Sequence, residues 1–199
     1  KDFEDTGKIP SKAKIAKVIE EHFYLRYASD SVTERLKVGA MKSLAKYVQM
    51  WEKDFSLSVK TERPFELEFE NSLIAGSIDM IKREEGNETV LEVIDFKTGK
   101  ADNDLMHKYE LQVQLYTIAA QEALGINTQK ALIHFIDTDK NERLAVQTSP
   151  AALETAKEEL SFAIQGITKA TFRRDARQDN ICKSCDWCNM CPKRKGYRG

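Results

Sequence analysis

Apolar residues recur every three or four positions near the start of the chain and predict two helices there. The first covers about residues 11–24, with an apolar face of Ile15, Val18, Ile19 and Phe23. The second begins at a capping box, in which Glu34 follows Ser31 by three residues. Its apolar face holds Leu36, Leu44, Tyr47, Val48 and Trp51. We interpret both faces as surfaces that pack on the core, not as binding surfaces.

The middle of the chain alternates between apolar and polar positions, which is the period of a half-buried strand. Phe65, Leu67 and Phe69 alternate with glutamates, and this pattern predicts a first strand. Residues 73–81 and 90–97 flank the polar segment EEGNE, an arrangement that predicts an antiparallel hairpin. Two shorter strands are expected at 131–136 and 143–147.

Helical spacing returns in two later segments. Residues 108–124 predict a helix that ends at Gly125, with an inner face of Leu111, Leu115, Ile118, Ala119 and Ala123. Pro150 starts another helix, with an inner face of Leu153, Ala156, Leu160 and Ile167. The last thirty residues are expected to be irregular. This order of elements predicts the α/β class, with a central mixed sheet flanked by helices and a cysteine-rich C-terminal segment.

Length and composition favour one domain, because 199 residues with 41% apolar content can bury one core. We expect a helical part over about 1–55, the sheet over 56–147, and a C-terminal helix with the cysteine segment over 148–199. No apolar run is long enough to span a membrane, and no signal peptide is visible. The sequence starts at Lys1 and not at Met, so the start is either a trimmed end or the edge of a piece of a longer polypeptide.

The net charge of −1 conceals an uneven distribution. Residues 169–199 contain nine Lys or Arg against three Asp, so the rest of the chain is acidic. A basic end of this kind either follows a phosphate backbone or is a solvated tail, and the charge alone does not decide between them.

The segment VLEVIDFKTGK contains the candidate chemistry. Asp95 and Lys97 lie two residues apart on a strand and therefore point to the same face. Asp79 ends the preceding strand, from which it can meet Asp95 across the hairpin. Two carboxylates with the carbonyl of Phe96 would suit Mg²⁺ or Mn²⁺, and Lys97 would orient the attacking water. The alternative is a surface salt bridge between Asp95 and Lys97, which the pair by itself favours.

Three sequence blocks, taken in order, favour the metal site over the surface salt bridge. The segment GSID ends at Asp79, DFKTG begins at Asp95, and QVQLY runs from Gln112 to Tyr116. Together they resemble the RecB-like branch of the PD-(D/E)XK nuclease superfamily, over roughly residues 30–192. The segment ERPF, from Glu62 to Phe65, is similar to a short motif that precedes the first block in that branch.

The resemblance implies a restriction-endonuclease-like fold and a catalytic set of Asp79, Asp95, Lys97, Gln112 and Tyr116. It places Gln112 and Tyr116 beside the active site, where they help to position metal or DNA; a core aromatic is the alternative for Tyr116. The family often has a histidine metal ligand shortly after a glycine on an early helix. Here Ala-Met-Lys-Ser follows Gly39, with no histidine. His22 and His107 do not match that place, and His134 is interpreted as structural.

Four cysteines lie at even spacing near the end of the chain, namely Cys182, Cys185, Cys188 and Cys191. Such clustering predicts metal ligation in a reducing compartment and not a disulfide framework, so we expect a cytoplasmic protein. Zinc accepts four thiolates, but its Cys-x-x-Cys pairs are usually separated by a longer loop. The rhythm is closer to iron–sulfur ligation, and it resembles the C-terminal cysteines of AddB-type nucleases. We therefore favour a structural [4Fe–4S] cluster, with Zn²⁺ as the alternative.

These observations predict a Mg²⁺- or Mn²⁺-dependent deoxyribonuclease that cuts single-stranded DNA in repair or recombination. The N-terminal half is similar to nucleases fused to UvrD-like helicases. This resemblance favours a piece of a larger helicase–nuclease, so a helicase domain is the expected partner; no P-loop for ATP occurs in this chain. DNA phosphates are expected to contact Arg173, Arg174, Arg177, Lys193, Arg194 and Lys195. The alternative is an inactive nuclease fold that binds single-stranded DNA or a partner.

Overall fold

The computed structural model describes residues 3, 6–99 and 103–171, except for the side chains of residues 88, 103 and 104. The chain divides into two compact units, Lys1–Ala156 and Lys157–Gly199, and each is described by itself. The predicted cysteine segment lies outside the described residues.

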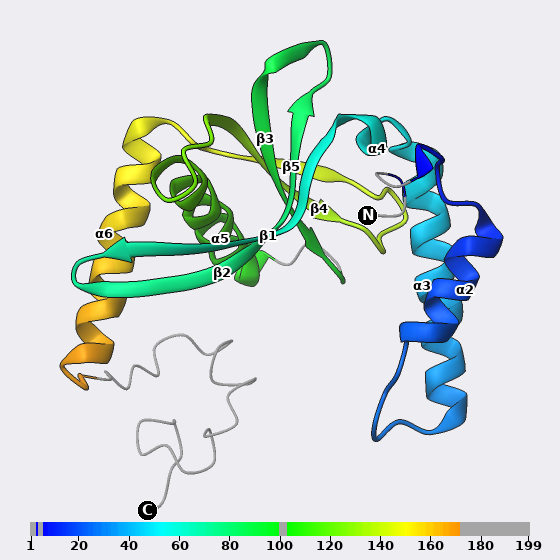
Figure 1. The fold of residues 1–199 in the computed structure, drawn as a ribbon. Helices are drawn as coiled ribbons and strands as arrows, with labels where there is room; N and C mark the ends of the chain where they lie inside the picture. Colours follow the sequence, from blue (N-terminus) through cyan, green and yellow to red (C-terminus); the bar gives the residue numbers. More distant parts are fainter. Residues whose placement is uncertain (1–2, 4–5, 100–102, 172–199) are drawn as a thin grey trace, which may run out of the picture. The chain divides into compact units, whose positions relative to one another are not determined.

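Five strands form one sheet in the order β1-β2-β3-β4-β5 (Figure 1). Their bounds are Ser58–Phe69, Ser72–Glu84, Asn87–Lys97, Thr128–Phe135 and Arg143–Val146. β1 with β2, β2 with β3 and β4 with β5 pair antiparallel, whereas β3 and β4 pair parallel. The predicted α/β class with a central mixed sheet flanked by helices is therefore confirmed.

Two tight turns connect the first three strands. Glu70 and Asn71 both have positive φ, at 47° and 57°, as a two-residue type I′ hairpin turn requires. The second turn contains Gly86, with φ of 83°, inside the EEGNE segment that predicted it. The predicted hairpin of β2 and β3 is thus confirmed.

Helix α5 (Asn103–Glu122) connects β3 to β4 and covers one face of the sheet (Figure 1). Its fully buried side chains are Val113, Thr117, Ile118, Ala119 and Ala120, most of which are small. These small side chains allow the helix to lie close to the strands. The predicted face was partly wrong, because Ala123 is exposed while Val113 and Ala120 were missed. Gly125, with φ of 65°, follows the helix end as predicted.

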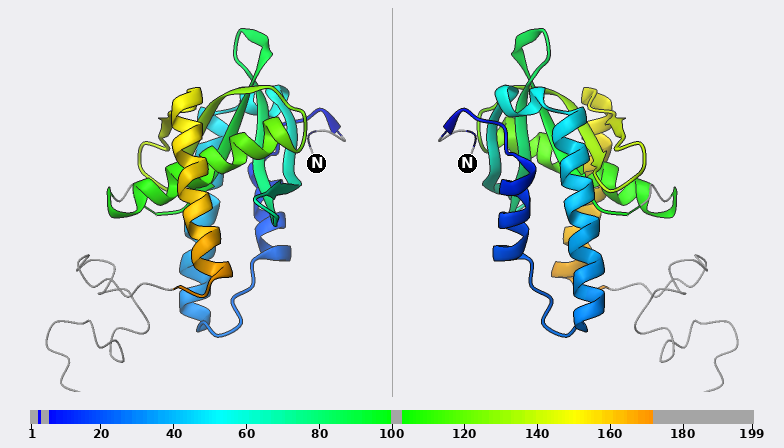
Figure 2. Two further views of the ribbon diagram at one scale, coloured as in Figure 1. Left: turned by 90° about the vertical axis from the view of Figure 1, so that its left-hand side faces the viewer. Right: turned by 90° about the vertical axis from the view of Figure 1, so that its right-hand side faces the viewer.

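Helices α2 (Lys12–His22), α3 (Asp30–Met50) and α4 (Lys53–Leu57) lie on the other side of the sheet. Figure 2 shows α2 and α3 side by side. The predicted capping box was wrong, because α3 begins after Ser29 and has no side-chain cap. Val18 and Leu36 were predicted to face the core, but they are 40% and 45% exposed.

Helix α6 (Pro150–Thr168) begins at Pro150, as predicted, and the Ser149 hydroxyl accepts a hydrogen bond from Ala152 N. Leu153 and Ala156 are buried, as expected, whereas Ile167 is exposed and corrects the predicted face. Among the described residues, none of the helices is both long enough and apolar enough to cross a membrane.

Candidate active site

The hairpin of β2 and β3 brings the two predicted metal-binding aspartates together. Its ladder reaches the pair Met80 and Ile94, and Asp79 and Asp95 are next in that register. Asp79 Oδ2 accepts a hydrogen bond of 2.8 Å from Phe96 N. The side chain of Asp79 therefore holds the backbone of β3 at the residue between Asp95 and Lys97.

Asp95 is 1% exposed, and its Oδ2 lies 2.6 Å from Lys97 Nζ. The two groups form a buried, hydrogen-bonded ion pair. Burial raises the pKa of the Asp95 carboxyl, Lys97 lowers it, and the charge of Asp79 raises it further. Because burial and the Asp79 charge disfavour the ionised form of Asp95, an additional cation beside it would stabilise that ionised form.

Lys97, Gln112 and Tyr116 form a chain of hydrogen bonds from the sheet to α5. Lys97 Nζ donates to Gln112 Oε1 at 2.8 Å, and Gln112 Nε2 donates to the Tyr116 hydroxyl at 2.8 Å. Lys97 Nζ also lies 5.0 Å from the ring centroid of Tyr109, a cation–π distance. The structure thus brings together all five predicted catalytic side chains. Tyr109 was missed, although it precedes Gln112 by three residues and so shares its helix face.

Tyr116 contacts both the core and the site. Its ring packs edge-on against Phe65, with centroids 5.9 Å apart. Burial raises the pKa of its hydroxyl, the Gln112 hydrogen bond lowers it, and the charges of Asp95 and Asp79 raise it. Gly76 makes room for this pair, since a Cβ on Gly76 would lie 2.8 Å from Phe65 Cζ. The glycine of the GSID segment therefore has a steric role behind the site.

The opposite face of β3 carries Phe96. Its ring lies 5.7 Å from that of Tyr47 and 5.4 Å from that of His134, measured between centroids. His134 is fully buried; its Nδ1 accepts from Arg143 Nε, and its Nε2 lies 2.6 Å from Asn141 Oδ1. Burial lowers the pKa of His134 to about 4, so the ring is neutral. His134 lies on the face opposite to Asp95 and Lys97, in agreement with its structural interpretation.

A buried charge network on this same face was not predicted. Asp54 accepts from the Tyr47 hydroxyl at 3.0 Å and from Arg143 Nη1 at 3.2 Å, and it pairs with Lys82 at 3.4 Å. Lys82 also pairs with Glu92 at 2.9 Å. The signal was present in the sequence, because Lys82 and Glu92 interrupt apolar strands, but their pairing required the register of β2 and β3.

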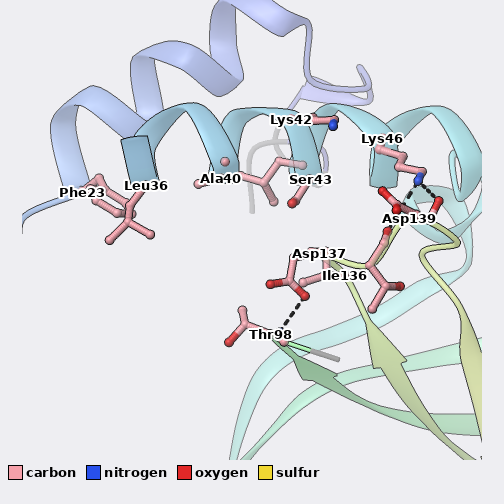
Figure 3. Close-up of a pocket in the computed structure, with 14 residues that line it drawn as sticks. Phe23, Leu36, Ala40, Lys42, Ser43, Lys46, Thr98, Ile136, Asp137 and Asp139 are labelled. Carbon is pink, nitrogen blue, oxygen red and sulfur yellow. Dashed lines mark hydrogen bonds between the residues drawn. The ribbon is translucent and has the colours of Figure 1, made fainter. Parts of the chain in front are cut away.

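A cavity of about 760 Å³ opens where β3 ends. Figure 3 shows α3 along one side and residues 136–139 on the other. Gly99 N donates to Asp137 Oδ1 at 2.7 Å, and Lys46 Nζ donates to the carbonyls of Thr138 and Asp139. These bonds hold the loops of β3 and β4 against α3.

The donor set fits a divalent cation that takes two carboxylates from the protein. The buried carboxylate of Asp95 lies opposite Asp79, and carboxylate oxygens suit Mg²⁺ and Mn²⁺. Within residues 6–99 and 103–171, no group of three His, Cys, Asp or Glu is close enough to hold a metal. Several predicted ligands and DNA contacts lie outside the described residues, namely Cys182, Cys185, Cys188, Cys191, Arg173, Arg174, Arg177, Lys193, Arg194 and Lys195.

Comparison with known proteins gives one family and a set of similar folds. The family model described as PD-(D/E)XK nuclease superfamily matches residues 6–192. A solved structure from Eubacterium rectale, described as a candidate exonuclease, is 12% identical, with a TM-score of 0.55. That match covers 90% of this chain and 69% of the other. The crystal structure of SSO0001 is 18% identical, with a TM-score of 0.48, over 91% of this chain and 81% of the other. No curated protein sequence matches the chain.

Proposed function

Since this chain belongs to the PD-(D/E)XK nuclease superfamily, we propose that it is a Mg²⁺- or Mn²⁺-dependent deoxyribonuclease acting on single-stranded DNA. The observation that carries the proposal is the buried carboxylate of Asp95, which is 1% exposed, has Asp79 opposite it in the hairpin register and lies 2.6 Å from Lys97 Nζ. Burying such a group costs free energy, which a bound cation would offset.

Asp79, Asp95 and the carbonyl of Phe96 would hold the cation. A divalent ion in this place polarises a phosphate and lowers the pKa of a bound water. The hydrogen bond from Phe96 N to Asp79 Oδ2 already fixes Asp79 against β3. It thereby holds the three ligands in one short stretch of the hairpin before any cation binds.

Lys97 is the group that faces the substrate. Gln112 accepts one of its N–H bonds and is itself held by the Tyr116 hydroxyl. The ammonium is therefore positioned on the same side as Asp95, where it can offset the charge that develops on the phosphate. Tyr116 acts through Gln112 and is a positioning residue in this scheme.

The remaining parts of the proposal concern the C-terminal residues and the wider protein. Four cysteines, Cys182, Cys185, Cys188 and Cys191, would hold a [4Fe–4S] cluster with a structural role. The basic residues around them would contact DNA phosphates without reading sequence. We assign the chain to repair or recombination as the nuclease part of a helicase–nuclease, on the basis of the sequence resemblance.

Substitution of the two aspartates tests the activity. We expect Asp79→Ala and Asp95→Ala each to abolish Mg²⁺- or Mn²⁺-dependent cleavage of a labelled single-stranded oligonucleotide. Glu66→Ala, at an exposed position of β1, is the control and should cleave like the wild type. Cleavage that survives both aspartate substitutions refutes the assignment of the site.

A binding module without catalysis is the second candidate. It is favoured by the absence of a third His, Cys, Asp or Glu beside Asp79 and Asp95 in the described part of the chain. This candidate predicts that the wild-type chain binds the oligonucleotide but cuts it with neither Mg²⁺ nor Mn²⁺. The same assay on the wild type therefore separates the two functions.

A further inference from the structure

The cavity at the end of β3 is a groove along α3, and one of its walls is apolar. Leu36, Ala40 and Leu44 lie four residues apart on α3 and line one wall. Phe23 lies at the Leu36 end, and Ile136 lies opposite (Figure 3). Ten residues of helix separate Leu36 from Lys46, so the groove follows α3 for about 15 Å.

Polar groups stand at the margin of this groove without partners. Ser43 and Thr98 line it, and neither hydroxyl has a hydrogen-bond partner in the described part of the chain. The ammonium of Lys42 likewise has no partner among those residues. Lys46, by contrast, is occupied by the carbonyls of Thr138 and Asp139. Within the described residues, the groove therefore offers the ammonium of Lys42 and two hydroxyls beside an apolar wall.

The groove opens at the end of the strand that carries Lys97. Thr98 and Gly99 line the groove and follow Lys97 directly in the chain. Ile136 also lines it, and Ile136 N donates to the carbonyl of Lys97 at 3.0 Å. A nucleic-acid strand that has its scissile phosphate beside Lys97 and passes the end of β3 would bring a neighbouring nucleotide to the groove.

We propose that this groove binds the base of a nucleotide adjacent to the scissile phosphate of single-stranded nucleic acid, with Lys42 at a backbone phosphate. The assignment rests on the proposed nuclease function. A base has an apolar face for Leu36, Ala40 and Leu44 and a polar edge for the two hydroxyls. Contacts with a face shared by all bases are sequence-tolerant, so the site grips a strand without selecting its sequence.

Filling the groove tests the proposal. A Cβ on Gly39 meets no atom within 4 Å, so the double variant Gly39→Leu/Ser43→Leu adds two apolar side chains to the groove and changes no charge. The matched control is Val38→Leu/Gln49→Leu, at exposed positions of α3 that do not line the groove. Circular dichroism checks that both variants fold, and the single variant Gly39→Leu replaces the double one if it does not.

Binding is measured with the full chain, by fluorescence anisotropy of a labelled oligothymidylate in Ca²⁺, so that no cleavage is needed. We expect the groove variant to bind roughly fivefold more weakly or worse, the low end of the loss for one base contact, and the control to bind like the wild type. A second probe is an abasic strand of the same length, on which the groove variant and the wild type should bind equally.

Two results would overturn the proposal. One is binding of oligothymidylate by the groove variant within twofold of the control variant. The other is an equal loss on the abasic strand, which would make the groove a phosphate site and not a base site. A failed cleavage assay with Asp79→Ala and Asp95→Ala as its controls would overturn the nuclease function alone, because binding in Ca²⁺ is measured independently.

Discussion

Replacing Asp54 by alanine should disrupt the buried charge network behind the site and lower the stability of the protein. The Asp54 side chain is 4% exposed, and the side chains of its partners Arg143 and Lys82 are 9% and 6% exposed. Asp54→Ala removes the acceptor of Tyr47 and the carboxylate of Arg143, while Lys82 keeps Glu92 at 2.9 Å. One positive charge is then left buried without its carboxylate.

Breaking a buried pair by removing one partner costs about 3–5 kcal/mol. Little of this is screened by solvent, because the three side chains are almost completely covered. For a chain of this size each kcal/mol lowers Tm by about 2–4 °C, so we expect a decrease of about 6–20 °C. The double variant Asp54→Leu/Arg143→Met removes both charges and should lose less than Asp54→Ala alone, since it strands no cation.

Thermal and urea unfolding followed by circular dichroism measure both variants. A loss below about 1 kcal/mol for Asp54→Ala, the value of a surface ion pair, would refute the reasoning. A double variant less stable than Asp54→Ala would refute it as well, because the cost would then lie in lost packing.

Three further predictions concern the site and its supports. The pKa of His134 in the folded protein, about 4, lies below its ordinary 6.5, so stability present above pH 6.5 is lost as the pH falls to 4, by about 3 kcal/mol. His134→Gln should flatten this part of the pH dependence in urea unfolding, although Asn141, Arg143 and Asp54 still surround the position. Burial raises the pKa of Asp95 above its ordinary 3.8. Without metal, its contribution to folding stability is therefore most favourable below pH 3.8 and is lost as the pH rises through the folded-state pKa. Asp95→Asn in EDTA should therefore have a higher Tm than the wild type at pH 7, with a difference that shrinks toward pH 4. Gly76→Ala should destabilise the chain by about 1–3 kcal/mol because its Cβ meets the Phe65 ring, and adding Phe65→Leu should restore stability in the same unfolding assay.

The sheet and the catalytic strand were predictable because their signals are local. Alternating apolar residues defined β1, and the EEGNE segment defined the turn between β2 and β3. The side chains of Asp95 and Lys97 share a face because a strand has a period of two, which needs no tertiary information. Gln112 and Tyr116 came from the resemblance, and the structure joins Gln112 to Lys97 and Tyr116 to Gln112.

The charge network and the groove could not be predicted because both depend on distant segments. Asp54 and Arg143 are 89 residues apart, and no local pattern pairs them. The face of α5 was mispredicted for a similar reason, since the strands beneath the helix decide which side is buried. Val18 and Leu36 follow helical spacing but are 40% and 45% exposed, whereas Ile15 and Ile19 of the first predicted face are buried.

Successive side chains of β3 point to opposite faces of the sheet, and this alternation determines where residues can be inserted into the chain. Asp95 and Lys97 face α5, and Phe96 between them packs against Tyr47 and His134 on the reverse side. A single inserted residue before Asp95 would exchange the two faces, placing the aspartate and lysine among aromatic rings and the phenylalanine in the site. Substitution can therefore tune this centre, but a shift of one residue destroys it. Evolution and protein engineering can add residues at the turn around Gly86, where the chain reverses and the register of both strands is preserved.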